Sequence, residues 1–273
     1  MPVIGPAKQT PPSYASGYAK SASESANPNL WDGLVGAWMP SLGVTGDTLR
    51  DVSGNGSHGT LTNMDAATDW VATSKGLALD FDGVNDYVES QDPIDAMGSS
   101  PRTLSSSFEI RSIADQTIAG FGNPNTSQWF YIFIYQNKWY FSGYANDFSI
   151  ATPLPTLGKH HLAVSYDSSD VRFYLDNLLI AQFAKTLNTQ AGVLRIGLRA
   201  QFDNFPLNGQ VDSVYLHDRV LSPQEIKQLY VDPLAPFRQR RSIPFGITAA
   251  PSFNNWYARP GRTNRIVGSG VHV

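Results

Sequence analysis

Three stretches between Leu34 and Val88 decide the fold. Leu34–Trp38 reads Leu-Val-Gly-Ala-Trp, Asp51–Leu61 reads Asp-Val-Ser-Gly-Asn-Gly-Ser-His-Gly-Thr-Leu, and Leu79–Val88 reads Leu-Asp-Phe-Asp-Gly-Val-Asn-Asp-Tyr-Val. In the last stretch, apolar and acidic residues alternate with a period of two, which predicts a strand with one buried face. Asp82-Gly83 then favours a turn. The chain therefore opens with short strands joined by tight turns.

Further strands are indicated downstream. Trp129–Tyr135 and Trp139–Phe141 are aromatic runs separated by three polar residues, which predicts a hairpin with a short loop. Val171–Asp176 alternates and is followed by Asp176-Asn177, a turn that returns the chain through Leu178–Ala181. Leu194–Arg199 also alternates, which predicts another half-buried strand.

One helix start is clear. Ser222-Pro223-Gln224-Glu225 has the pattern of a capping box, in which the serine hydroxyl and the glutamate carboxylate satisfy free backbone N–H groups. Proline at the first helical position loses no hydrogen bond. Ile226, Leu229 and Tyr230 supply the apolar stripe of this short helix.

Length and composition fit one β-rich domain. The 273 residues are 41% hydrophobic and 12% aromatic, with 23 Gly and 18 Pro, which indicates many strands and turns around one core. The longest apolar run, Trp129–Tyr135, has seven residues, so no membrane insertion is expected. The chain has no cysteine and hence no disulfide. Its N-terminal residues lack a charged segment followed by an apolar one, so no signal peptide is expected.

Charge is distributed unevenly along the chain. Residues 233–273 contain six arginines and no lysine or acid, which gives +6, and residues 1–30 carry +1. Because the whole chain has a net charge of −3, the body between them carries −10. Both terminal segments lack an apolar period, so we expect two arms, and the basic, aromatic C-terminal one is suited to bind an acidic protein surface. The acidic body argues against nucleic acid as a partner.

The motifs at both ends of the body resemble those of laminin G-like domains of the concanavalin A-like superfamily. The resemblance covers roughly residues 31–231, from Leu34–Trp38 through His160–Tyr166 and Gly209–Tyr215 to the helix at Ser222. It implies an all-β fold, a two-sheet antiparallel jelly-roll sandwich, with an N-terminal arm at 1–30, the domain at 31–232 and a C-terminal arm at 233–273. Such domains mostly bind ligands and sometimes catalyse.

The Asp51 loop has two interpretations. Asp51, Ser53 and Asn55 place oxygen atoms at alternate positions, as in the first half of an EF-hand loop, but the twelfth position is Thr62 instead of Glu. In the resembling family this loop contributes to a calcium site with an aspartate of the late strand, so the implied calcium ligands here are Asp51, Asn55 and Asp212. The alternative is an Asx-rich turn held by local hydrogen bonds.

Catalytic patterns are not found. None of the five histidines has zinc-site spacing, and His160 and His161 are expected to have structural roles at a strand end. Glycan hydrolases of the superfamily carry a Glu-x-Asp-x-x-Glu strand, and none of the four glutamates stands in such a run. No Gly-x-Ser-x-Gly elbow is present. We therefore expect a protein that is not an enzyme, with a polysaccharide lyase or hydrolase as the less favoured reading.

A set of aromatic residues could stack on sugars. These are Trp129, Tyr131, Tyr135, Trp139, Tyr140 and Tyr144. The alternative, that they fill the core of the sandwich, is favoured, and one alternation set must do so because one face of each strand points inward.

The leading hypothesis is a bacteriophage virion structural protein, either a capsid decoration or a tail or fibre component, made in the host cytoplasm. Laminin G-like proteins of phage particles pair the Leu-Val-Gly-Ala-Trp opening with a Leu-Tyr-x-x-Pro ending and an Arg-rich tail, as Leu229–Pro233 and the arginines do here. The arms would bind other virion proteins or copies of this chain, and the jelly roll would bind host cell-surface glycans. The residues expected to bind partners are Arg238, Arg240, Arg241, Trp256, Arg259 and Arg262. The competing hypothesis is a stand-alone, calcium-dependent carbohydrate-binding module.

Overall fold

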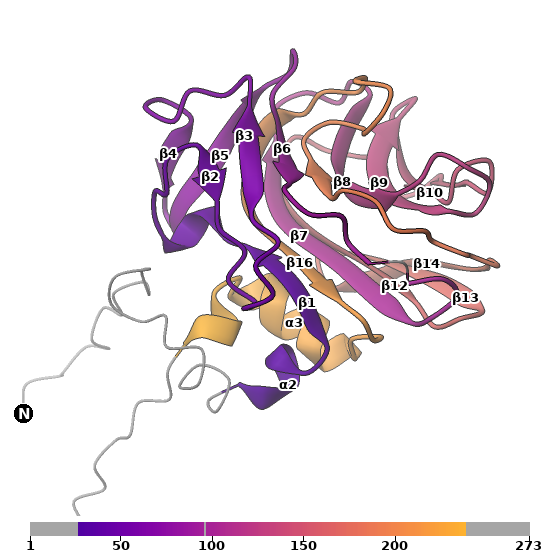
Figure 1. The fold of residues 1–273 in the computed structure, drawn as a ribbon. Coiled ribbons are helices and arrows are strands. Elements are labelled where there is room, and N and C mark those ends of the chain that lie inside the picture. The colour runs from indigo at the N-terminus through magenta and orange to yellow at the C-terminus, as the bar shows by residue number, and fades with distance from the viewer. Residues whose placement is uncertain (1–26, 96, 239–273) are drawn as a thin grey trace, which may run out of the picture. The chain divides into compact units, whose positions relative to one another are not determined.

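The computed structural model describes residues 27–95 and 97–238, and these form a sandwich of two antiparallel sheets (Figure 1). The predicted all-β jelly-roll architecture is confirmed. Sheet A has the strand order β14 (Leu178–Ala184), β13 (Asp170–Leu175), β12 (Gly158–Tyr166), β7 (Arg102–Ile110), β16 (Asn208–His217), β5 (Gly76–Asp82) and β4 (Trp70–Thr73), and β1 (Leu34–Trp38) also pairs with β16. Sheet B has the order β11 (Phe148–Ile150), β10 (Lys138–Ser142), β9 (Trp129–Tyr135), β8 (Gln116–Gly122), β15 (Arg195–Ile196), β6 (Tyr87–Ser90), β3 (Gly59–Thr62) and β2 (Thr48–Leu49).

The predicted turns have the expected backbone. Gln136 and Asn137 have φ angles of 49° and 56° between β9 and β10, and Asp176 and Asn177 have 48° and 69° between β13 and β14. Two successive positive φ values characterise the tight turns whose twist matches that of paired strands. Both hairpins predicted from the sequence are therefore confirmed.

The strand predicted from Leu194 is shorter than its alternating pattern suggested. β15 contains only Arg195 and Ile196, because Gly197 has a φ of 86° and leaves the strand geometry. A Cβ at Gly197 would lie 2.4 Å from the Phe81 ring. The glycine thus allows the backbone to approach the core closely while it turns.

The main core lies between the two sheets. Its large, fully buried side chains come from both sheets and include Phe81, Phe108 and Leu162 from sheet A and Phe121, Phe130 and Trp139 from sheet B. In β9 the residues Phe130, Ile132 and Ile134 point into this core, so their neighbours in the strand point to the outer face of sheet B.

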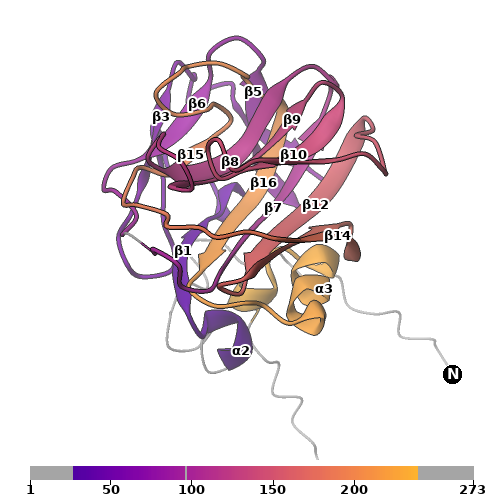
Figure 2. The same cartoon turned by 90° about the vertical axis from the view of Figure 1, so that its right-hand side faces the viewer.

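A second apolar cluster covers the outer face of sheet A. The short helix α2 (Pro28–Trp31) and the helix α3 (Pro223–Val231) lie against this sheet, on the side away from β8, β9 and β10 (Figures 1 and 2). Leu30, Ile226 and Leu229 are fully buried there against Ala163 and Tyr215. Two 3₁₀ turns, η1 (Pro40–Leu42) and η2 (Ala235–Phe237), complete the cluster. Neither helix of the described residues has the length and apolar character needed to cross a membrane.

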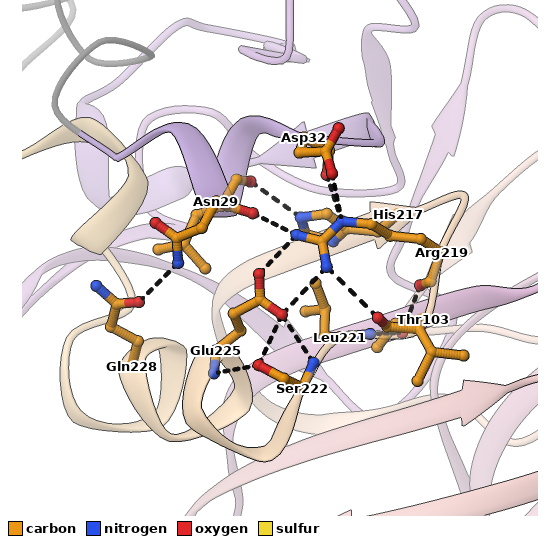
Figure 3. Close-up of polar contacts among 11 residues, drawn as sticks. Asn29, Asp32, Thr103, His217, Arg219, Leu221, Ser222, Glu225 and Gln228 are labelled. Carbon is orange, nitrogen blue, oxygen red and sulfur yellow. Dashed lines mark hydrogen bonds and ion pairs between the residues drawn. The ribbon is translucent and has the colours of Figure 1, made fainter.

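The capping box predicted at α3 is present and extends into a larger polar network (Figure 3). Ser222 Oγ accepts the Glu225 backbone N–H, and the Glu225 carboxylate accepts the Ser222 backbone N–H. Arg219 donates to both Glu225 oxygens and to the backbone carbonyls of Asn29 and Asp32. This arginine therefore ties α2 to the start of α3.

Two segments that the sequence placed in the arms are packed on this cluster. Trp31 Nε1 donates to the Pro236 carbonyl at 2.8 Å, and its ring meets Phe237 edge-on at a centroid distance of 5.6 Å. Asn27 Nδ2 donates to the Arg238 carbonyl at 2.8 Å. The packed body thus includes residues 27–30 and 233–238, because their apolar side chains cover the outer face of sheet A. The remainder of both predicted arms lies outside the described residues.

Candidate functional site

The Asp51 loop adopts the hydrogen-bonded turn. Asp51 is buried, and its Oδ1 accepts the backbone N–H groups of Ala37 and Ser53 at 3.0 and 2.9 Å. Its Oδ2 accepts from the Ser53 hydroxyl at 2.9 Å and from the Ser57 N–H at 3.1 Å. Both carboxylate oxygens are therefore engaged in holding the loop against β1.

Each of the three implied calcium ligands has its own protein contacts. Asn55 Nδ2 donates to the carbonyls of Leu34 and Val35, which orients its amide toward β1. Asp212 lines a different pocket, beside Lys159 at 3.7 Å. Among residues 27–95 and 97–238, no three acidic or histidine side chains cluster in a way that could hold a metal. The described donor set does not fit calcium, because hard cations need several converging oxygens.

The outer face of sheet B carries a continuous layer of aromatic side chains, which we call the aromatic face. It consists of Trp129, Tyr131, Phe133 and Tyr135 of β9, Tyr140 of β10, and Tyr144, Phe202 and Phe205 from loops. Outward alternation along β9 places its four rings in a row. Trp129, Tyr131 and Phe133 form the buried floor of this layer.

The rim of the aromatic face is open to solvent. Phe202 is 45% exposed, and Tyr135, Tyr140 and Tyr144 are half-buried. Tyr140 stacks on Phe133 at a centroid distance of 5.0 Å, and the ring of Tyr144 lies nearly parallel to that of Phe202 at 6.3 Å. The partly exposed rings are thus held in fixed orientations by their neighbours.

A cation is built into the same layer. The Arg199 guanidinium lies 4.5 Å from the ring centroid of Phe205, 5.0 Å from that of Phe202 and 5.7 Å from that of Trp129. Its Nε donates to Asn204 Oδ1 at 2.9 Å. Guanidinium groups stack on aromatic rings and retain N–H donors at their edges. The aromatic face therefore combines flat apolar surfaces with hydrogen-bond donors.

The sequence interpretation of these aromatics was right in part. Trp139 is fully buried between the sheets, as the core alternative requires, whereas its neighbour Tyr140 belongs to the aromatic face. Phe202 and Phe205 were not among the candidate residues, although they contribute to the layer. They lie in the loop after β15, and a single sequence gives no signal that a loop will fold back onto β9.

The side chain of His160 has structural contacts at the strand end, which is the role expected for it from the sequence, whereas His161 is held here through its backbone. His160 Nδ1 lies 3.0 Å from Asp176 Oδ2, and its Nε2 lies 2.8 Å from the Thr156 carbonyl. Burial opposes the charge of His160, but these two contacts outweigh it and raise its pKa. Asp176 Oδ1 also accepts the His161 backbone N–H at 2.8 Å. These contacts with Asp176 therefore fasten β12 to the turn between β13 and β14.

Of the residues expected to bind partners, the structure describes one. Arg238 donates through Nε to Asp232 Oδ2 at 2.7 Å and through Nη2 to Asp232 Oδ1 at 3.2 Å. This half-buried pair anchors the last described residue to the end of α3. The other five, Arg240, Arg241, Trp256, Arg259 and Arg262, lie outside the described residues.

Comparisons with solved structures show the same fold. Domain 4 of the GH43 extracellular arabinanase of Geobacillus stearothermophilus, in complex with arabinotriose, matches with a TM-score of 0.57 and 18% identity over 72% of this chain and 98% of that domain. A mutant of Trypanosoma rangeli sialidase displaying trans-sialidase activity matches with a TM-score of 0.57 and 15% identity over 81% of this chain and 39% of the sialidase. The receptor binding domain of botulinum neurotoxin C/D mosaic serotype matches with a TM-score of 0.54 and 11% identity over 74% of this chain and 51% of its own length.

Sequence comparison gives the family. No curated protein matches the chain. The family model described as the concanavalin A-like lectin/glucanases superfamily, Laminin_G_3, matches residues 82–227, which is more than half of the sequence. The match contains most strands of both sheets and the capped start of α3. The chain therefore belongs to the concanavalin A-like lectin/glucanases superfamily, as a Laminin_G_3 domain.

Proposed function

We propose that this protein binds glycans, without cleaving them, through the aromatic face of sheet B. The observation that carries the proposal is the rim of that face, where Tyr135, Tyr140 and Phe202 are partly exposed and the Arg199 guanidinium lies over the Phe202 ring. Sugar rings present apolar C–H faces and hydroxyl edges, which suit flat aromatic surfaces and N–H donors respectively. The arabinanase domain, which shares this fold, was solved with arabinotriose, and this agrees with an oligosaccharide as ligand.

Two of the three described glutamates have structural contacts, and this favours binding over catalysis in our proposal. Glycoside hydrolysis needs two carboxyl groups on either side of a scissile bond. Of the described glutamates, Glu89 pairs with Arg195 at 2.5 Å and Glu225 pairs with Arg219 at 2.7 Å. The Glu89 carboxylate joins β6 to β15, and the Glu225 carboxylate belongs to the cap of α3. Their structural contacts explain why these acids are present.

The test removes ring surface from the aromatic face. Tyr140→Ala and Phe202→Ala are expected to weaken binding to immobilised oligosaccharides, arabino-oligosaccharides included, about tenfold each, which corresponds to about 1.4 kcal/mol. The measurement is a glycan array followed by titration calorimetry on the best ligand, with and without EDTA.

Leu179→Ala is the matched control, because Leu179 is a half-exposed apolar residue of β14 in the other sheet. Equal affinity of all three variants and the wild type would refute binding at the aromatic face. Loss of binding in EDTA would favour the calcium-dependent module instead.

We further propose that the domain serves as a bacteriophage virion structural protein, anchored through its basic C-terminal residues. The six arginines of residues 233–273 contrast with a body that carries −10, so the C-terminal segment is suited to an acidic surface on another virion protein or on a second copy. Residues 233–238 are packed on sheet A and Arg238 pairs with Asp232, so we assign this role to the five arginines that follow residue 238 in the sequence.

The virion role predicts that a chain shortened to residues 1–238 folds but is lost from particles. The matched variant keeps the full length and replaces Arg240, Arg241, Arg259 and Arg262 with glutamine, which removes charge alone. Both are produced together with the other particle components, and the purified particles are quantified by mass spectrometry. Particle content equal to that of the wild type in both variants would exclude anchoring by this segment.

A further inference from the structure

Asp212 is a buried carboxylate that stands at an irregularity of sheet A. Along β16, Val211 pairs with Phe108 and Ser213 with the adjacent Ser107, so Asp212 is an extra residue in a bulge. On the opposite edge β16 changes partner here, from β5 to β1. Ser41 Oγ fills this junction and donates to the Asp212 carbonyl at 3.0 Å. Bulges commonly redirect one side chain, and here the side chain is directed to the outer face of sheet A.

Asp212 lines a pocket between sheet A and the C-terminal end of α3. The pocket has a volume of about 370 Å³ and is walled by Ser107, His161 and Lys159 from sheet A and by Tyr230 from α3. His161 and Ser107 are register partners on β12 and β7, and the bulge places Asp212 beside Ser107 on β16. The floor is therefore a polar row across three neighbouring strands. Its volume is within the range of about 300–1,000 Å³ that is typical of small-molecule sites.

Two polar atoms of this floor lack a partner among the described residues. Asp212 Oδ1 and His161 Nδ1 are both buried and accept or donate no hydrogen bond there. The Asp212 side chain is 5% exposed. Buried polar atoms are nearly always hydrogen-bonded, so a pocket with two unsatisfied ones is suited to a ligand that supplies the missing bonds.

Burial sets the protonation of both groups. It lowers the pKa of His161 to about 4, so the imidazole is neutral at pH 7 and offers one donor and one acceptor nitrogen. Burial also raises the pKa of Asp212, and Lys159, with its Nζ 3.7 Å from Oδ2, opposes this shift. A charged carboxylate at this buried position reduces the stability of the fold, and such a loss of stability is common at binding sites.

The charges of the pocket select a neutral ligand. The Asp212 and Asp176 carboxylates repel an anion, whereas Lys75 and Lys159, which also line the pocket, repel a cation. A hydroxyl group both donates and accepts, so it can bind a carboxylate oxygen, an imidazole nitrogen and an ammonium group in turn. Tyr230, 40% exposed, lies with its ring 6.1 Å from that of His161 and provides an apolar wall at the mouth.

We propose that this pocket binds the end of a glycan, a single neutral sugar residue held through its hydroxyl groups by Asp212 and His161. The site is on the sheet opposite to the aromatic face, so the proposal does not depend on binding there. Binding of one residue, in contrast to stacking along a chain, is expected from a pocket of this volume with convergent polar atoms.

The experiment uses the isotope-labelled full chain and backbone amide NMR, with methyl glycosides of glucose, galactose, mannose and arabinose as probes. At least one of them is expected to shift the His161 and Tyr230 amide signals in a saturable manner. Asp212→Ala, which removes both oxygens, is expected to weaken this binding at least tenfold. Asp80→Ala is the matched control, because Asp80 is a sheet A aspartate that pairs with Arg111 and does not line the pocket.

Two further variants separate pocket binding from binding at the aromatic face and from misfolding of Asp212→Ala. Tyr140→Ala is expected to leave pocket binding unchanged, which separates it from binding at the aromatic face. Tyr230→Ala alters the exposed wall and is expected to weaken binding even if Asp212→Ala does not fold. The proposal is refuted if no probe shifts these amide signals when the sugar is present at millimolar concentration, about 50-fold above that of the protein. Tighter binding of methyl glucuronide than of every neutral glycoside would refute the neutral ligand.

Discussion

At the scale of single residues, His217 shows how burial sets the charge of a side chain. His217 is fully buried on β16, and its Nε2 lies 3.0 Å from the Leu30 carbonyl. Burial lowers its pKa to about 4, and the contact with Leu30 opposes the shift only partly. Between pH 6.5 and 4 the unfolded chain therefore binds a proton that the folded chain does not. The contribution of this neutral histidine to stability is complete above pH 6.5 and is lost as the pH falls toward 4.

His217→Gln is expected to reduce the acid sensitivity of the fold. Glutamine keeps an N–H donor for the Leu30 carbonyl but does not titrate. The free energy of unfolding of the wild type should fall by about 2 kcal/mol more than that of the variant between pH 7 and pH 5, because one proton is worth about 1.4 kcal/mol per pH unit. Urea unfolding at the two pH values measures this difference. Equal decreases in both proteins would contradict the neutral, buried imidazole.

At the scale of elements, the sequence correctly predicted the features that depend only on consecutive residues. The capping box of α3 and the turns at Gln136-Asn137 and Asp176-Asn177 are confirmed, since each is specified by two to four consecutive residues. The bulge at Asp212 had no such signal. It arises because β16 exchanges β5 for β1 as its edge partner, which is a property of pairing between distant strands.

At the scale of the whole molecule, the two ends of the described chain pack against each other on sheet A. Trp31, Phe237 and Tyr215 are buried in one cluster, and the Tyr215 hydroxyl donates to the Pro233 carbonyl at 2.5 Å. The Arg219 network joins α2 and α3 on the same side (Figure 3). Residues more than 200 positions apart thus stabilise each other. The outer face of sheet A is covered by residues from both ends of the described chain.

A chain ending at Asp232 is expected to be less stable than one ending at Arg238. The shorter chain loses the burial of Leu234, Ala235 and Phe237 and exposes the Trp31 ring. Burial of one large apolar side chain contributes about 1.5–3 kcal/mol, so the difference in the free energy of unfolding should be at least about 3 kcal/mol. Urea unfolding of residues 1–232 and 1–238 tests this. Equal stabilities would show that the terminal packing contributes little.

The sequence by itself determined the hairpins and the capped helix, because period-two alternation and turn chemistry depend on adjacent residues. The sandwich was implied by the resemblance of its motifs to laminin G-like domains. Tertiary structure decided which side of sheet B each aromatic residue faces, so that Trp139 fills the core while Tyr140 joins Phe202 on the outer face. It also placed Asp212 in a pocket with His161. Alternation assigns residues to two faces, but only the pairing of distant strands and the return of loops determine what each face meets.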